Sequence, residues 1–263
     1  MKLKSLMLGA VLLATVSTTL ISGETPLDQL PKGYIDKEAL PNSITIVPEA
    51  PLAGSVRQKM DDAIASAAVK LNKTARFKLA SEDADLFFPH AHNRFSCALG
   101  AVISEEKTPR LYNLMLRALV DAGLSTYQAK IKYSRMRPFT VNNAPICTPE
   151  DEKILRNDGS YPSGHTALGW AWALILAELA PDKADAILAR GLSYGESRII
   201  CNVHWNSDVV AGRIMASATV ARLHNNPEFI ADMKAAKAEL ATALAPKKQT
   251  CQEEAAALEI KLY

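Results

Sequence analysis

One apolar segment constrains the fold more than any other part of the sequence. Residues 167–177 read Ala-Leu-Gly-Trp-Ala-Trp-Ala-Leu-Ile-Leu-Ala, with no polar face. A helix that is apolar on all sides is either buried or spans a membrane. This run ends before Glu178 and Pro181, and it is shorter than the roughly 20 residues that a bilayer requires. We therefore expect an all-α fold, a single globular helical domain built round a buried central helix at about residues 163–179.

Helical periodicity continues on both sides of this segment. It predicts helices over residues 55–79, 84–102, 109–123, 184–200 and 209–224, and a helical stretch after Pro227 that is rich in Ala, Lys and Glu. His90 and His92 lie within the second of these ranges. Two residues that are two positions apart do not share a helix face, so we expect surface or packing roles for them and no metal pair.

The two ends of the chain differ from this helical body. Residues 1–23 have a charged head, an apolar stretch and small residues at the exit, the pattern of a secretory signal peptide. Prolines recur through residues 24–52, which favours an extended N-terminal arm because proline excludes a long helix. We expect residues 53–245 to form the all-α domain and residues 246–263 a C-terminal helical tail.

Export would change both the charge and the cysteine chemistry. Removal of Lys2 and Lys4 takes the formal net charge from +2 to 0, so we expect no binding to nucleic acid polymers and none to membranes after signal removal. In an oxidising compartment the even number of cysteines favours one or two disulfides, with three full pairings open. No cysteine has a partner at zinc-like spacing, so no metal site is predicted. The cysteines are Cys97, Cys147, Cys201 and Cys251.

The stretch from Gly195 to Asp208 has the composition of a reactive site. His204 and Asp208 are four residues apart, so on a helix or a helix-entering turn Asp208 can fix one ring nitrogen of His204. The other nitrogen can then act as a nucleophile or a general base. Arg198 indicates an anionic substrate. Taken alone, this pattern favours a polar helix start capped by Asn206 or Ser207.

Two further stretches favour the same chemistry. Residues 130–139 carry four cations and end in Arg137-Pro138, where proline fixes the direction of the arginine, although such a run can also be a solvated face. Ser163 and Gly164 open the central helix, whose first amides can bind an anion. His165 follows directly. Taken alone, the motif from Ser163 to His165 is equally consistent with Ser163 as an ordinary helix cap and His165 as a core histidine.

In combination and order, the three stretches resemble the signature of the type 2 phosphatidic acid phosphatase (PAP2) superfamily. That superfamily includes bacterial non-specific acid phosphatases, membrane lipid phosphatases and vanadium haloperoxidases, and the sequence is most similar to the secreted class A acid phosphatases. The matching residues are Lys130 with Arg137-Pro138, Pro162-Ser163-Gly164-His165, and Ser197-Arg198 with His204 and Asp208.

The resemblance implies a PAP2-type acid phosphatase domain at residues 53–245, with no metal and no cofactor. It implies a catalytic set of His204 as nucleophile, Asp208 to orient it, and His165 as general acid and base. It also implies a phosphate-binding set of Lys130, Arg137, Ser163, Gly164 and Arg198. Further implications are a periplasmic homo-oligomer, an acidic pH optimum, broad specificity for small phosphate esters, and phosphate transfer to alcohols.

Three alternatives use parts of the same pattern. A lipid phosphatase would have several membrane spans. A vanadate-dependent haloperoxidase would hold vanadate with the same cations, because vanadate mimics a pentacoordinate phosphoryl group. A secreted module that binds phosphate esters without cleaving them would need the cations and would not need His204 and Asp208.

Overall fold

The computed structural model describes residues 31–86 and 90–262, and the described residues contain helices and no strand. The predicted signal peptide, residues 1–23, lies outside them. Helices of eight residues or more are α2 (Val56–Val69), α3 (Ala75–Glu82), α5 (Pro109–Leu124), α9 (Gly164–Leu179), α10 (Ala184–Ile200), α11 (Asn206–Leu223), α12 (Pro227–Leu240) and α13 (Lys248–Leu258). Shorter helices are α1 (Ser43–Ile46), α4 (Ser96–Leu99), α6 (Tyr127–Tyr133), α7 (Pro138–Asn142) and α8 (Glu152–Leu155).

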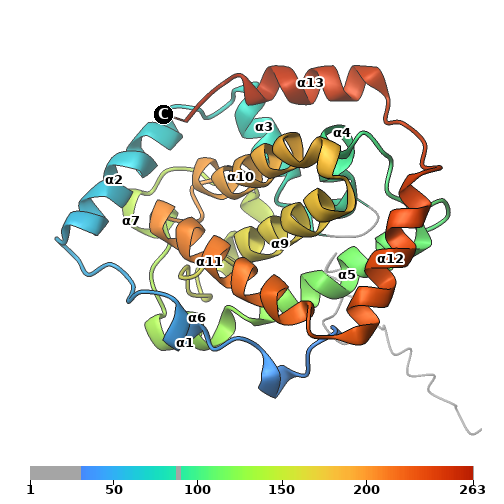
Figure 1. The fold of residues 1–263 in the computed structure, drawn as a ribbon. Helices are drawn as coiled ribbons and strands as arrows, with labels where there is room; N and C mark the ends of the chain where they lie inside the picture. Colours follow the sequence, from blue (N-terminus) through green and yellow to red (C-terminus); the bar gives the residue numbers. More distant parts are fainter. Residues whose placement is uncertain (1–30, 87–89, 263) are drawn as a thin grey trace, which may run out of the picture.

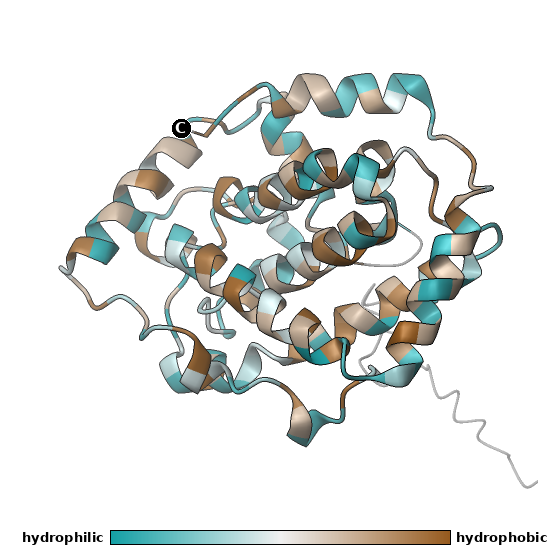
Figure 2. Cartoon of the chain, viewed as in Figure 1, coloured by the Kyte–Doolittle hydropathy of each residue, from teal (hydrophilic) through white to brown (hydrophobic). Residues whose placement is uncertain are grey.

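Helix α9 is the buried central helix that its sequence predicts. It packs against α5, α10 and α11, which surround it in Figure 1. Trp172, Ile175 and Leu176 on this helix are fully buried. By contrast, hydrophilic residues run along the outer helix α13 in Figure 2. Most of the apolar side chains of α9 are therefore buried in the interior of one all-α domain.

Two glycines allow the helices around α9 to approach closely. A Cβ atom at Gly169 would lie 2.2 Å from the ring of Tyr194 on α10. A Cβ atom at Gly212 would lie 2.6 Å from the carbonyl oxygen of Ser163. Both separations are far below van der Waals contact, so a larger residue would force the helices apart. Gly212 therefore lets the second turn of α11 approach the N-cap of α9.

Two of the expected helices are shorter or more broken than their periodicity indicates. The range 84–102 is not one helix, because the structure has a 3-10 turn at Ala91–Phe95 followed by α4. The sequence has a proline at position 89, and a helix interior does not accommodate proline. The range 55–79 is divided into α2 and α3 by a turn in which Lys73 has φ of 65°. Thr74 then caps α3 by accepting a hydrogen bond from Phe77.

The remaining expectations for this part of the chain agree with the structure. Helix α5 ends at Leu124, one residue after the glycine where a break was expected. His90 is exposed and His92 is buried, with its ring centroid 5.1 Å from that of Tyr112. Burial lowers the pKa of His92 to about 4. These two histidines therefore have the surface and packing roles that were predicted.

The two disulfides settle which of the three pairings the cysteines adopt. One joins Cys97 to Cys251 and fastens α13 to α4. The other joins Cys147 to Cys201, directly after α10. The described part of the N-terminal arm contains only a 3-10 turn at Lys37–Ala39 and the short α1. It is attached to the body where the Tyr34 and Ile35 amides donate to Asp121.

Candidate active site

The three sequence stretches meet at the N-terminal ends of α9 and α11. The Ser163 amide donates to the Asp208 carbonyl oxygen over 3.0 Å, which joins the second stretch to the third. Arg137 lies 3.1 Å from His204, which joins the first to the third. Lys130 donates to the Gly159 carbonyl over 2.6 Å. The fold thus brings all the predicted site residues to one place.

His204 lies in the turn before α11, and Asp208 lies in the first turn of that helix. The Asp208 Oδ2 atom accepts a hydrogen bond from the Trp205 amide at 2.8 Å and lies 3.3 Å from His204 Nδ1. A carboxylate at this position also benefits from the positive end of the helix dipole. The Asp208 carboxylate therefore both accepts from the Trp205 amide at the N-cap of α11 and orients His204.

The contacts of His204 define its tautomer. Its Nε2 atom lies 3.1 Å from Nη1 of Arg137. A guanidinium can only donate hydrogen bonds, so Nε2 accepts with its lone pair and the ring proton resides on Nδ1, toward Asp208. Burial, together with the charges of Arg137 and Lys130, lowers the pKa of His204 well below its usual 6.5. The imidazole is thus neutral, with its basic nitrogen directed at the cations.

The predicted phosphate-binding cations are all buried. Lys130 and Arg137 share the carboxylate of Asp158, at 3.4 Å and 2.8 Å. Burial and the neighbouring Arg137 lower the pKa of Lys130 to about 8. Arg198 lies on α10, and its Nε atom has no hydrogen-bond partner among the described residues. Such a cluster of desolvated cations interacts strongly with an anion that enters it.

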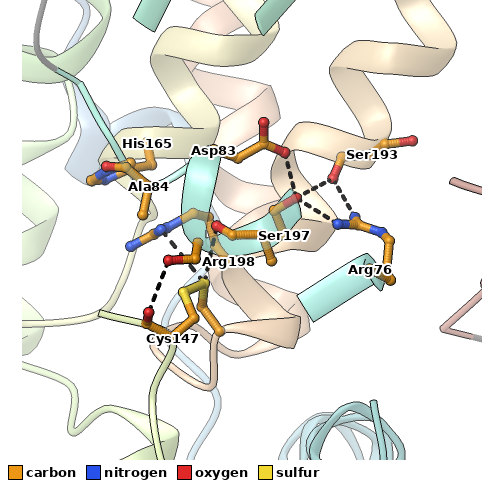
Figure 3. The surroundings of a disulfide bond; sticks show 11 residues. Arg76, Asp83, Ala84, Cys147, His165, Ser193, Ser197 and Arg198 are labelled. Atoms are coloured by element: carbon orange, nitrogen blue, oxygen red, sulfur yellow. Dashed lines mark hydrogen bonds between the residues drawn. A yellow bond between two sulfur atoms is a disulfide. The ribbon is translucent and has the colours of Figure 1, made fainter. Parts of the chain in front are cut away.

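His165 occupies the first turn of α9, and its orientation is set by a distant segment. Its Nε2 atom lies 3.0 Å from the carbonyl oxygen of Ala84, just beyond α3 (Figure 3). A carbonyl only accepts, so Nε2 carries a proton and Nδ1 is the nitrogen available for proton exchange. Burial and the charge of Arg198 lower the pKa of His165 well below 6.5.

Ser163 has a capping role in this structure. Its hydroxyl accepts hydrogen bonds from the amide and the hydroxyl of Thr166, at 3.2 Å and 2.9 Å. Its own amide is engaged with Asp208. The amides of Gly164 and His165 are the first two of α9 and have no acceptor within the helix. Direct phosphate contact by Ser163 therefore stays a prediction, and the two following amides are the better placed donors.

A buried polar network supports this arrangement from behind. Asp83, just after α3, forms a two-pronged ion pair with Arg190 on α10 and accepts from the Ser197 hydroxyl at 2.6 Å. Arg76 donates to the same hydroxyl at 2.9 Å. Figure 3 shows Asp83, Ser197 and Arg76 of this network beside the disulfide of Cys147. It fixes α3 on α10, and so it fixes the carbonyl that binds His165.

Sequence reasoning missed both the Asp83 network and one cation of the site. Arg135 was counted only as part of the basic run, yet its Nη1 atom lies 2.6 Å from Asp208 Oδ1. Its Nη2 atom lies 2.7 Å from Asp61 on α2. The only sequence feature that points to a role for Arg135 is its position two residues before Arg137. Nothing in the local sequence indicates that α2 lies alongside.

The described ranges contain no group of three or more His, Cys, Asp or Glu side chains that could hold a metal ion. In the same ranges, no helix combines the length and the apolar character that crossing a membrane requires.

Comparison with known proteins gives consistent similarities. The pattern of the PAP2 superfamily matches residues 111–229. A non-specific acid phosphatase of Providencia stuartii is 43% identical over 209 residues, which cover 79% of this chain and 84% of the relative. An acid phosphatase of Zymomonas mobilis is 45% identical over 190 residues, 72% of each chain. A non-specific acid phosphatase of Salmonella typhimurium is 43% identical over 166 residues, 63% of this chain and 66% of the relative.

Proposed function

The chain belongs to the PAP2 superfamily, and on that premise we propose that it is an acid phosphatase acting on phosphate monoesters through a phosphohistidine at His204. The observation that carries the proposal is the placement of this imidazole. One nitrogen lies against the carboxylate of Asp208, and the other is directed with its lone pair into a buried cluster of cations. That is the arrangement that a nucleophilic histidine requires.

In the proposed first step, the phosphoryl group binds among Lys130, Arg137 and Arg198. The amides of Gly164 and His165 add donors to its oxygens. The His204 Nε2 lone pair then attacks phosphorus in line as the ester P–O bond breaks. Nδ1 of His165 gives its proton to the departing alkoxide, while Asp208 stabilises the positive charge that develops on the nucleophilic ring. Arg137, which donates to Nε2 in the free protein, turns to the phosphoryl oxygens.

In the second step, the neutral His165 accepts a proton from water. The resulting hydroxide attacks phosphorus, the N–P bond breaks, and inorganic phosphate leaves with His204 neutral again. An alcohol in place of water would give phosphate transfer by the same step. The buried cations of the chain neutralise the phosphoryl charge throughout.

The protonation states favour activity in acid. The low pKa of His204 keeps this nucleophile neutral below pH 6.5. The low pKa of His165 means that its charged form is populated only in acid or beside a bound anion. Both shifts arise from the burial and the cations that would bind the substrate. We therefore attribute the acidic preference to the site itself.

We further propose that the protein is exported to the periplasm and acts there on small phosphate esters as a homo-oligomer. The sequence of residues 1–23 supports export. Two disulfides and no free cysteine in the described ranges support an oxidising compartment.

The test is hydrolysis of p-nitrophenyl phosphate across pH, with and without EDTA, combined with alkaline quenching and mass spectrometry to trap the phosphoenzyme. We expect acid-peaked turnover that is insensitive to the chelator, with a phosphoryl group on His204. The variant His204→Ala should lose turnover and phosphoenzyme together. His224→Asn is the matched control, because His224 is an exposed histidine whose hydrogen-bond partners among the described residues are Val220 and Glu178. Near wild-type turnover in His204→Ala would refute the mechanism. Absence of p-nitrophenyl phosphate hydrolysis by the wild type at every pH would refute the activity.

A further inference from the structure

We propose that Arg135 is a positioning residue for the nucleophile, which acts by holding Asp208, and that Asp61 on α2 fixes Arg135 in turn. The resulting series of side-chain contacts runs from Asp61 through Arg135 and Asp208 to His204. The inference rests on the function proposed above, because it assigns Arg135 a role toward the nucleophilic imidazole. It extends the site to a helix that contains none of the residues predicted from the motifs.

The two oxygens of Asp208 have different partners. Oδ2 accepts from the Trp205 amide and faces His204. Oδ1 accepts from Arg135 at 2.6 Å. The Asp208 side chain is fully buried, and the Arg135 side chain is 8% exposed. A carboxylate with both oxygens occupied cannot rotate without breaking a charge-assisted hydrogen bond, so Arg135 restricts the orientation of the atom that faces His204.

Asp61 fixes Arg135 from the other side. Its carboxylate lies 2.7 Å from Nη2 of Arg135 and also accepts from the amide and the hydroxyl of Ser207. Gln58, one helical turn earlier on α2, accepts from the same Nη2 at 2.6 Å. The planar guanidinium thus bridges two carboxylates, a geometry that a lysine ammonium cannot reproduce. Helix α2 is thereby fastened to the first turn of α11.

The terminal nitrogens of Arg135 are committed to partners inside the protein. Its Nη1 atom donates to Ser207 and Asp208, and its Nη2 atom donates to Gln58 and Asp61. These four bonds use every N–H group on the two terminal nitrogens. In contrast, Arg198 retains an unpartnered Nε in the site. Loss of Arg135 should therefore impair the chemical step and leave substrate binding nearly intact.

Electrostatics give the proposal a signature that loss of packing would not produce. Burial raises the pKa of Asp208, and Arg135 opposes that rise. The other titratable or charged groups that act on this carboxylate include His204, Lys130, Arg137 and Tyr161, with the Ser160 hydroxyl as a further donor. Without the Arg135 charge, both Asp208 and His204 would take up protons at higher pH. The acidic limb of the pH profile of kcat should then move to higher pH.

The kinetic test compares Arg135→Gln, Arg135→Lys and Asp61→Asn with Arg222→Gln. Arg222 is the control because it is an exposed arginine near the other end of α11, bonded only to the Ala39 carbonyl. For Arg135→Gln we expect kcat to fall about 10- to 100-fold. Losses of this size are typical when a hydrogen-bond partner that orients the ligands of a metal site is removed, and Arg135 orients Asp208 in a comparable way. KM for p-nitrophenyl phosphate should change less than about threefold. Arg135→Lys and Asp61→Asn should lose less, and Arg222→Gln should match the wild type.

Three results would overturn the proposal. They are an unchanged kcat in Arg135→Gln, a raised KM with unchanged kcat, and a lowered kcat without any shift of the acidic limb. If Arg135→Gln does not fold, as judged by circular dichroism, the kinetic constants of Arg135→Lys and Asp61→Asn decide the question. Both variants keep a positive charge at position 135, so kcat should fall with KM nearly unchanged and without a shift of the acidic limb to higher pH. An unchanged kcat or a raised KM in both variants would overturn the proposal.

A second readout does not depend on catalysis. In protein labelled with ¹⁵N-histidine, the ring signals of His204 report which nitrogen carries the proton, and His204→Asn assigns them. We expect the Nδ1-protonated form in both proteins, because Arg137 donates to Nε2 in each. The Nδ1–H proton signal should move upfield in Arg135→Gln, because the hydrogen bond from Nδ1 to Asp208 loosens. This result would support the positioning role even if p-nitrophenyl phosphate were not hydrolysed, in which case only the proposed function would fail. An unchanged Nδ1–H signal in Arg135→Gln would refute the positioning role alone.

Discussion

Among individual residues, the two site histidines differ in what fixes their rings. His204 is held by a side chain four residues away on the same helix start, so its partner is visible in the sequence. His165 is held by the carbonyl of Ala84, which is 81 residues away. His204 is buried, His165 is partly buried, and both lie near buried cations that lower their pKa values. The same environment therefore sets the reactivity of both rings.

These environments predict the pH dependence of catalysis. Because His204 and His165 both have pKa values well below 6.5, the maximum of kcat/KM should lie below pH 6.5. Lys130, with its pKa lowered to about 8, should lose its charge above that pH and weaken phosphate binding. The measurements are kcat/KM for p-nitrophenyl phosphate and Ki for inorganic phosphate from pH 3 to pH 10. A maximum near neutrality, or a Ki that is constant through pH 9, would contradict this account.

Among the helices, α3 and α10 form the pair that supports His165. Asp83 meets both Arg190 and Ser197 in a fully buried contact. Buried ion pairs of this kind add little net stability, but the loss of one partner leaves an uncompensated charge in the interior. The pair therefore fixes one relative position of the two helices.

The consequence can be tested with Asp83→Asn. Because Arg190 would lose a buried carboxylate, we expect a loss of about 3–5 kcal/mol in the free energy of unfolding. We also expect a lower kcat below the melting temperature, because Ala84 follows Asp83 and holds His165. The control is Asp182→Asn, an exposed aspartate near the start of α10, which should change stability by less than about 0.5 kcal/mol. Urea unfolding and turnover at 25 °C measure the two effects. Equal stability of both variants would contradict the role of the pair.

For the molecule as a whole, the two disulfides have different relations to the site. The Cys97–Cys251 bond joins residues that are 154 positions apart and attaches α13 to the body. The Cys147–Cys201 bond spans 54 positions, and Cys201 follows Arg198 by three residues. The first bond therefore concerns the stability of the whole chain, and the second also concerns the position of Arg198, a cation proposed to bind phosphate.

Paired cysteine variants should separate these two effects. Replacement of Cys97 and Cys251 by alanine should cost about 2–5 kcal/mol, because the reduced chain gains entropy when unfolded. Its kcat at 25 °C should stay within about twofold of wild type. Replacement of Cys147 and Cys201 should lower both stability and kcat. Each pair is the control for the other in thermal unfolding and turnover assays, and a loss of activity confined to the first pair would contradict the assignment.

Much of this protein can be predicted from its sequence because the relevant signals are local. The apolar run of α9 requires burial, and the structure buries it. The spacing of His204 and Asp208 places them together on one helix start. The motif residues Lys130, Arg137 and Arg198 were recognised from their order along the chain. These features depend on helical period and on residue type, both of which are legible without coordinates.

Other features were decided only by the tertiary structure. The contact between Arg135 and Asp208 spans 73 residues, and that between Asp83 and Arg190 spans 107. The same is true of the cysteine pairing, which the sequence left with three possibilities. A charged side chain can pair with any opposite charge that the fold brings near, so its type and spacing do not specify the partner. Close packing around α9 selects one partner for each, because a buried charge without one is too costly to retain.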